Sequence, residues 1–217
     1  MIAIILPTRG LVFAEVENSI ELMRQFIPQT IVLRTWNRTL PEAQNELVEM
    51  ALGIEDLTHL LFVEEDTVMP HPQEGILKML ESKADIACID YGVAGYSCVA
   101  HDDKTNEILW CGFGCTFVKK EVFDKVEKPW FRTDKSLRLN DWTWIDNPAK
   151  YGGQDIWFCT KAREAGFTIT QIEGECKHLL LDGLGTPETN KGLHAISEKQ
   201  KIQTIQMIDV PKGMEVN

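Results

Sequence analysis

The sequence predicts an α/β protein with a mixed, mostly parallel sheet flanked by helices in a single domain. Strand-like apolar runs alternate with helix-like segments through the first 90 residues, which is typical of such a sheet. A length of 217 residues suits one domain with a sizeable core. A composition of 44% hydrophobic and 25% charged residues is that of an ordinary soluble globular protein.

The first half of the chain gives the clearest elements. Pro7 ends the first apolar run, and a segment rich in β-branched residues forms the second strand. Pro41 opens a helix whose acidic residues come early, as a helix start favours. The expected elements are strands at 2–7 and 30–35, a helix at 41–52, a strand at 59–63, a helix at 74–83 and a strand at 84–90.

The second half is less regular. Two strands are expected around Gly112 and Gly114, followed by a helix with apolar residues near Phe123. Residues 129–153 are polar and rich in Trp, and they predict a long loop of the kind that is often functional. A glycine-led helix at about 154–165 then precedes another strand.

The expected organisation is a domain at 1–180 and a tail at 181–217 that belongs to the same domain. The tail holds glycines, polar residues and His194, and we expect it to fold over the ligand as a lid.

Charge and composition exclude several classes of protein. A net charge of −11 and a pI near 4.9 repel phosphate polyanions, so non-specific nucleic-acid binding is not expected. No apolar run approaches the roughly 20 residues of a membrane span. The first ten residues lack a basic leader and a cleavage site, so they predict a strand rather than a signal peptide. The six cysteines lie mostly in apolar segments and are interpreted as reduced thiols of a cytoplasmic protein.

Three adjacent carboxylates, Glu64, Glu65 and Asp66, follow the apolar strand at 59–63. In an extended chain Glu64 and Asp66 point to one side and Glu65 to the other. Ligands bind outside the carboxyl ends of the strands in such sheets. Two carboxylates there can hold a divalent cation and leave positions for phosphate oxygens. A solvated acidic turn is the alternative.

Two further residues are candidates for chemistry. Asp155 opens a predicted helix after two glycines, where it would act either as a helix cap or as a general base. His178 follows a strand and lies two residues after Cys176. Such a Cys-x-His pair suggests a zinc site, with Cys111 and Cys115 as further ligands. The spacing lacks the Cys-x2-Cys pairs of structural zinc sites, and a lone histidine is more often structural.

The turn after the first strand carries Pro7, Thr8, Arg9 and Gly10, whose polar and basic groups could meet a nucleotide. It does not have the Gly-x-Gly-x-x-Gly spacing, and no Walker A sequence is present. Classical dinucleotide and P-loop sites are therefore not expected.

Taken in order along the chain, these motifs resemble the GT-A glycosyltransferases, and most of all small family-2-type enzymes of bacteria and phages. The resemblance covers residues 1–180 in outline. It rests on "PTRG", "PEAQNELVEMAL", "EEDTVMP" after an apolar strand, "CGFGCTFVKKEVFDKV", "GGQDIWFCTKAREAG" and the late histidine.

The resemblance implies a hexosyltransferase-like enzyme that moves a sugar from a nucleotide sugar, with UDP as the expected nucleotide. The acidic triplet matches the DXD motif of the family, and Mn²⁺ or Mg²⁺ is the implied cofactor. Its implied metal ligands are Asp66, His178 and Glu64. The implied donor site comprises Pro7, Thr8, Arg9, Asn45, Glu64, Glu65 and Asp66.

The resemblance also implies the acceptor side. Asp155 matches the base of inverting members, and Gly112, Gly114 and Gln154 match the sugar pocket. Trp142 and Trp144 are expected to form an apolar platform for the sugar or the acceptor, with loop anchoring as the alternative. The chain departs from the family pattern at Glu64, where an aspartate is usual, at Gln154 for glutamate and at Gln44 for arginine.

Two other functions stay open on the sequence. A nucleotidyltransferase usually carries a glycine-rich, lysine-bearing loop after its first strand, which "PTRGLVFAEVENS" lacks. A non-catalytic nucleotide- or sugar-binding module is favoured by the altered Glu64 and Gln154. The acceptor is equally open among glycans, other hydroxyl-bearing molecules and a modified DNA base.

Overall fold

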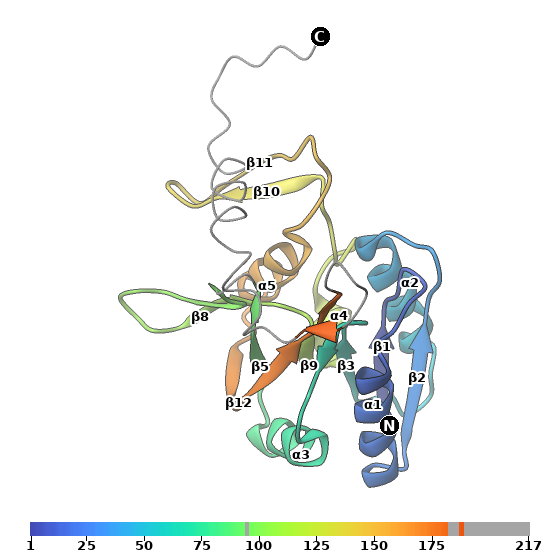
Figure 1. The fold of residues 1–217 in the computed structure, drawn as a ribbon. Coiled ribbons are helices and arrows are strands. Elements are labelled where there is room, and N and C mark those ends of the chain that lie inside the picture. The colour runs from blue at the N-terminus through green and yellow to red at the C-terminus, as the bar shows by residue number, and fades with distance from the viewer. Residues whose placement is uncertain (94–95, 182–186, 189–217) are drawn as a thin grey trace.

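The computed structural model describes residues 1–93, 96–181 and 187–188. A central sheet lies between two groups of helices (Figure 1). The helices are α1 (Ala14–Phe26), α2 (Leu40–Leu52), α3 (Pro72–Ser82), α4 (Lys120–Lys125) and α5 (Gln154–Glu164). The strands are β1 (Ile2–Leu6), β2 (Thr30–Arg34), β3 (His59–Val63), β4 (Thr67–Val68), β5 (Ile86–Val93), β6 (Tyr96–Ser97), β7 (Val99–His101), β8 (Ile108–Cys111), β9 (Cys115–Lys119), β10 (Lys135–Arg138), β11 (Thr143–Asp146), β12 (Ile169–His178), β13 (Leu180–Leu181) and β14 (Pro187–Glu188).

The main sheet has the order β2-β1-β3-β9-β5-β12-β4, with β6 paired to β5. Strands β2, β1, β3, β5 and β12 run in one direction, while β9 and β4 run in the other. The prediction of a mixed, mostly parallel sheet flanked by helices is therefore confirmed. The carboxyl ends of the five like-oriented strands meet at one edge, toward the β10–β11 hairpin in Figure 1.

Each face of the sheet has its own core. Strand β1 is buried throughout, with Ala3 and Ile5 in one core and Ile2, Ile4 and Leu6 in the other, as strand alternation requires. Helices α2, α4 and α5 contribute to the first core, and α1 and α3 to the second. The result is a three-layer arrangement that holds the sheet edge rigidly.

Helix α1 is an element that the sequence analysis did not predict. Its apolar Val16, Ile20 and Met23 recur at helical spacing and are buried against the second core. Glu15 and Glu17 lie in its first turn, where their negative charges interact favourably with the positive end of the helix dipole. The helix begins at Ala14, four residues after Gly10 of the turn.

The prediction of an irregular loop at 129–153 was wrong in part, because it contains the antiparallel β10–β11 hairpin. Both strands are short and polar, so neither shows the alternation that identifies a strand from sequence. The hairpin has a tertiary partner, since the Trp144 ring packs edge-on against Trp157 of α5 at 4.8 Å. The two strands expected around Gly112 and Gly114 are present as β8 and β9.

The predicted tail falls almost wholly on residues 182–186 and 189–217, so the expected lid with His194 lies outside the described residues. In the ranges that are described, no helix combines the length and the apolar character needed to cross a membrane.

Candidate functional site

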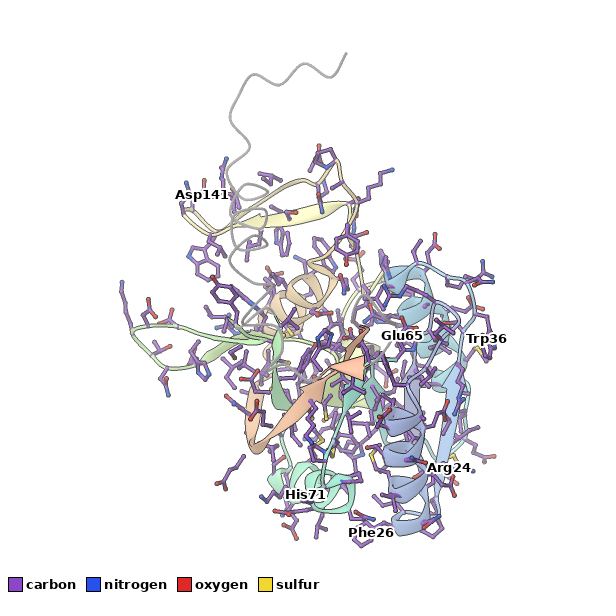
Figure 2. The ribbon with its side chains drawn as sticks, viewed as in Figure 1. Arg24, Phe26, Trp36, Glu65, His71 and Asp141 are labelled. Carbon is purple, nitrogen blue, oxygen red and sulfur yellow. The ribbon has the colours of Figure 1, made fainter. Side chains whose placement is uncertain are left out.

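The acidic segment 64–66 lies where β3 ends, at the carboxyl edge of the sheet. Figure 2 shows Glu65 at this edge, close to the end of β1. The backbone of each residue is bonded to a different part of the chain, which fixes the segment between three elements. These bonds join Glu64 N–H to the Gly114 carbonyl (3.4 Å), Phe13 N–H to the Glu65 carbonyl (3.1 Å) and Leu179 N–H to the Asp66 carbonyl (2.6 Å).

Glu65 is neutralised by Arg9. The Arg9 guanidinium lies 2.5 Å from Oε1 of Glu65, and the Arg9 backbone N–H donates to Oε2 at 2.8 Å. The Glu65 side chain is 11% exposed and the Arg9 side chain 71%. Partial burial acts to lower the pKa of Arg9, but the Glu65 hydrogen bond and the negative charges of Glu65 and Asp66 together outweigh it and raise that pKa. Glu65 thus holds the turn, and Arg9 remains open to solvent.

Asp66 and His178 form a second pair. Oδ2 of Asp66 lies 3.4 Å from Nε2 of His178, because β4 pairs with the end of β12. Nδ1 of His178 is buried and has no hydrogen-bond partner among the described residues. A carboxylate and an imidazole suit a divalent ion such as Mn²⁺. Within the described ranges, however, no three His, Cys, Asp or Glu side chains group closely enough to hold a metal by themselves.

The donor set therefore fits a metal only in part. Asp66 and His178 can supply two ligands, and a hard cation would take the remaining ones from phosphate oxygens or water. Glu64 is not part of this pair. Burial, followed by the charges of Asp155 and Asp66, raises the pKa of Glu64 well above its usual range.

Asp155 lies in the first turn of α5. The N-cap of that helix is Gly153, with φ +78°, so Asp155 is not the N-cap residue. Burial raises the pKa of Asp155 to about 7, although hydrogen bonds from the Phe113 backbone and the Gln154 side chain act to lower it. Its Oδ1 is buried and has no partner among the described residues. A carboxyl group that titrates near neutrality is suited to accept a proton.

The two glycines predicted for a sugar pocket lie close to the side chain of Tyr91. A Cβ on Gly112 would lie 2.3 Å from Oη of Tyr91, and one on Gly114 would lie 2.7 Å from its Cζ. The Gly114 N–H donates to the Tyr91 hydroxyl at 3.0 Å. Tyr91 is 4% exposed and is a site residue that the sequence analysis missed. Its signal was a polar aromatic at a strand end, which is weak by itself.

Other residues predicted for the donor site make hydrogen bonds within the protein or are buried. The Asn45 amide donates to the carbonyls of Pro41 (2.7 Å) and Phe131 (2.9 Å), and its Oδ1 accepts from Phe131 N–H at 3.2 Å.

The turn after β1 is also held by internal contacts. The buried Thr8 hydroxyl donates to the Leu11 carbonyl and accepts from the Gly10 N–H. Pro7 is also buried. Their contacts are structural, and Arg9 is the exposed member of the turn.

The two predicted platform tryptophans have different surroundings. Trp144 packs on Trp157, whose ring also lies beneath Arg132 and Lys161 at 4.8 and 5.2 Å. Trp142 is 52% exposed, has φ +58° at the hairpin turn and lies 6.3 Å from the Trp110 ring. Trp144 thus anchors the hairpin, whereas Trp142 presents a free aromatic surface.

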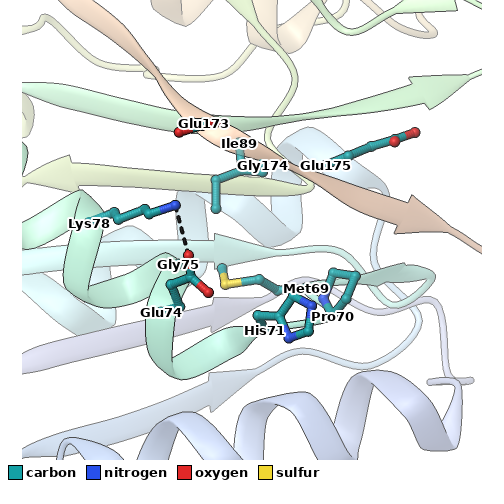
Figure 3. Close-up of a pocket in the computed structure, with 10 residues that line it drawn as sticks. All are labelled: Met69, Pro70, His71, Glu74, Gly75, Lys78, Ile89, Glu173, Gly174 and Glu175. Atoms are coloured by element: carbon teal, nitrogen blue, oxygen red, sulfur yellow. Dashed lines mark ion pairs between the residues drawn. The ribbon is translucent and has the colours of Figure 1, made fainter.

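The buried cysteines and one cavity are two further candidate ligand sites. Cys111, Cys115 and Cys176 are buried free thiols, and the described residues offer no zinc site. A cavity of about 250 Å³ lies between the start of α3 and β12 (Figure 3). Its lining includes Met69, Ile89 and the Glu74–Lys78 ion pair. It contains none of the predicted site residues.

No protein-family profile and no curated protein sequence matches this chain. Among solved structures, the crystal structure of A197 from STIV matches with a TM-score of 0.59 and 16% identity, over 87% of this chain and 93% of that one. The two proteins therefore share a fold over most of their length.

Two glycosyltransferases give weaker matches. GalNAc-T7, solved with UDP, GalNAc and Mn²⁺, has a TM-score of 0.46 and 11% identity over 82% of this chain and 43% of its own. Residues 1–349 of S. aureus TarS, solved with UDP, give 0.47 and 14% over 81% and 59%. At identities this low, the function has to be argued from the site.

Proposed function

We propose that this protein is a divalent-metal-dependent glycosyltransferase that moves a sugar from a nucleotide sugar to an acceptor hydroxyl. One observation carries the proposal. The Asp66–His178 pair, the exposed Arg9 and the high-pKa Asp155 all belong to segments that are bonded to one another at the carboxyl edge of the sheet. Metal ligands, a phosphate-binding cation and a base are the groups that such a transfer needs.

The donor half of the proposed site is formed by Asp66, His178 and Arg9. The carboxylate and imidazole would hold the metal, which when bound neutralises charge on the departing nucleoside diphosphate. The Arg9 guanidinium is positioned by Glu65 and mostly exposed, so it can donate charge-assisted hydrogen bonds to phosphate oxygens. UDP is the nucleotide to test first, because the family resemblance favours it.

The acceptor half centres on Asp155. This carboxylate would take the proton of the acceptor hydroxyl. In the same step the hydroxyl oxygen would bond to the anomeric carbon, and the bond from that carbon to the diphosphate would break. Attack from the face opposite the leaving group inverts the anomeric configuration. Gln154 bonds to the same carboxylate, and Trp142 offers a surface for an acceptor sugar. The net charge of −11 disfavours a polyanionic acceptor.

A second candidate is a nucleotide- or sugar-binding module without transfer activity. The observation that favours it is Tyr91, whose ring fills the space beside Gly112 and Gly114 where the resemblance places a sugar. In that case Arg9, Asp66 and His178 would still bind a nucleotide with a metal.

Thermal unfolding with UDP, GDP, ADP and CDP, each with and without Mn²⁺, tests the binding step. A ligand at 100 times its dissociation constant should stabilise the protein by about 2.7 kcal/mol. We expect a metal-dependent shift with one nucleotide that Asp66→Asn abolishes and that the exposed control Asp103→Asn retains. No shift with any nucleotide would overturn the proposal.

Nucleotide release from a panel of nucleotide sugars then separates the two candidates. Release from one donor, stimulated by an acceptor and lost in Asp155→Asn, is the expected result. Metal-dependent nucleotide binding without release across the donor and acceptor panels would favour the binding module.

A further inference from the structure

We propose that Tyr91 is a positioning residue that joins the two halves of the site. Its hydroxyl would fix the turn whose backbone hydrogen-bonds the proposed base. Its ring would fix the imidazole of the proposed metal pair. The inference rests on the proposed function. It concerns a side chain that neither the sequence motifs nor the comparisons single out.

Tyr91 is itself firmly held near the end of β5. Its N–H donates to Oδ1 of Asp90 at 2.8 Å, and its carbonyl accepts from Cys98 N–H at 3.1 Å. In the sheet it lies opposite Cys176 of β12. The side chain is 4% exposed although it carries a hydroxyl. A buried hydroxyl needs hydrogen-bond partners, and the partners it has here belong to the site.

On the base side, the phenol holds the turn at 112–114. The Gly114 N–H donates to Oη at 3.0 Å, and neither Gly112 nor Gly114 leaves room for a Cβ beside the ring. Between the two glycines lies Phe113, whose backbone hydrogen-bonds the Asp155 carboxylate. The position of that hydrogen bond therefore depends on the contacts of Tyr91 with the two glycines.

On the metal side, the same ring stacks with the imidazole of His178 in an offset arrangement. The ring centroids are 6.1 Å apart with an interplanar angle of 28°. His178 in turn lies 3.4 Å from Asp66. A ring stacked in this way limits the rotation of the imidazole, so Nε2 stays directed at the Asp66 carboxylate.

The phenol is a neutral group in this role. Burial raises the pKa of Tyr91 well above its usual range. Its oxygen accepts a hydrogen bond from the Gly114 N–H. Tyr91 therefore acts through the geometry of its neighbours and takes no proton from a substrate.

Two substitutions separate the two halves. Tyr91→Phe removes only the hydroxyl, so the stacking on His178 stays while the hydrogen bond from Gly114 is lost. We expect its turnover, measured as nucleotide release, to fall about tenfold, which corresponds to one hydrogen bond of about 1.4 kcal/mol. Its metal-dependent nucleotide affinity should stay within twofold. Tyr91→Leu removes the ring as well, and should also weaken that affinity about tenfold. Tyr96→Phe, at a 54% exposed tyrosine, is the matched control.

Amide hydrogen exchange gives a second readout that needs no substrate. In Tyr91→Phe the amides of Gly114 and Phe113 should both exchange faster, while amides of α2 and β1 should keep wild-type rates. Faster exchange at Gly114 with an unchanged Phe113 would overturn the inference, because the phenol would then not control the bond to Asp155.

A purely structural role is distinguishable from positioning. If the role were purely structural, Tyr91→Phe would lower stability, turnover and nucleotide affinity together. A loss of affinity alongside the loss of turnover would overturn the inference. Wild-type turnover in Tyr91→Phe would do the same. Failure of the proposed function is visible separately, since the wild-type protein would then show no metal-dependent nucleotide binding or no nucleotide release.

Discussion

Oδ2 of Asp66 lies 3.4 Å from Nε2 of His178, across the antiparallel pairing of β4 with β12. Both side chains are mostly buried, at 20% and 12% exposure, and Nδ1 of the imidazole has no partner in the described part of the chain. A short two-residue strand thus has a clear structural effect. It brings a carboxylate from the first third of the sequence to a histidine near the end of the described chain.

The first prediction concerns metal binding by this pair. Asp66→Asn and His178→Ala should each weaken Mn²⁺ binding in the presence of UDP about tenfold or more, because each removes one of two protein ligands. Isothermal titration of Mn²⁺ into the UDP-saturated protein measures the affinity. Asp103→Asn and His101→Ala change exposed residues of the same types and should bind as the wild type does. Equal affinities in all four variants would contradict the assignment.

The second prediction concerns Asp155 and stability. Its pKa of about 7 in the folded state is above the ordinary value of 3.8, so the folded protein binds a proton that the unfolded chain has lost. Stability therefore falls as pH rises from about 4 to 7 and stays lower above that range. Asp155→Asn should stabilise the protein at pH 8.5 by on the order of 1–4 kcal/mol, and by less at pH 5.5.

Urea unfolding at both pH values measures this difference, with Asp103→Asn as the control that should show no pH-dependent gain. A loss of stability at pH 8.5 in Asp155→Asn would show that the ionised carboxylate is stabilised in the fold. The same variant is expected to lack transfer activity, so the site would be more stable without its base.

The third prediction concerns the Arg9–Glu65 pair. Arg9→Ala leaves a mostly buried carboxylate without its charged partner and should cost about 1–3 kcal/mol. Glu65→Gln should cost less, because Gln can still accept from the Arg9 backbone N–H and leaves an exposed guanidinium. The double variant should therefore be more stable than Arg9→Ala alone. Urea unfolding at pH 7 measures the three values, and simple additivity would contradict the coupling.

The fold was predictable where the signal is local. Strands β1 and β3 are continuous apolar runs, and α2 shows helical spacing after Pro41, so each was identified from its own residues. The antiparallel insertion of β9 between β3 and β5 was not, because strand order depends on pairing between distant segments. The β10–β11 hairpin has one apolar cross-strand pair, Leu137 with Trp144, and the Trp144 ring packs on Trp157 of another element.

The site shows the same division. The acidic segment, Asp155 and His178 were predicted from motif order, and the structure places all of them near the carboxyl edge of the sheet. The roles of single side chains within those motifs were less predictable. Glu65 is occupied by Arg9, and Gly112 and Gly114 make room for Tyr91. These are three-dimensional contacts between segments, for which a sequence carries no local signal.

The fourth prediction concerns Asn45, which the resemblance implied to be a donor residue. Its amide bonds both backbone groups of Phe131, a buried residue whose ring stacks on Phe158 of α5 at 5.1 Å. Asn45→Ala leaves those two backbone groups unpaired in the core and should cost about 1–3 kcal/mol. Metal-dependent nucleotide affinity should stay within about twofold at temperatures where the variant is folded.

The control for this change is Asn18→Ala, at an exposed position of α1, which should alter stability by no more than about 0.5 kcal/mol. The two measurements separate a structural role of Asn45 from a role in binding. If Asn45→Ala kept wild-type stability and lost nucleotide affinity, the amide would belong to the donor site, and the bonds to Phe131 would have to open when the nucleotide binds.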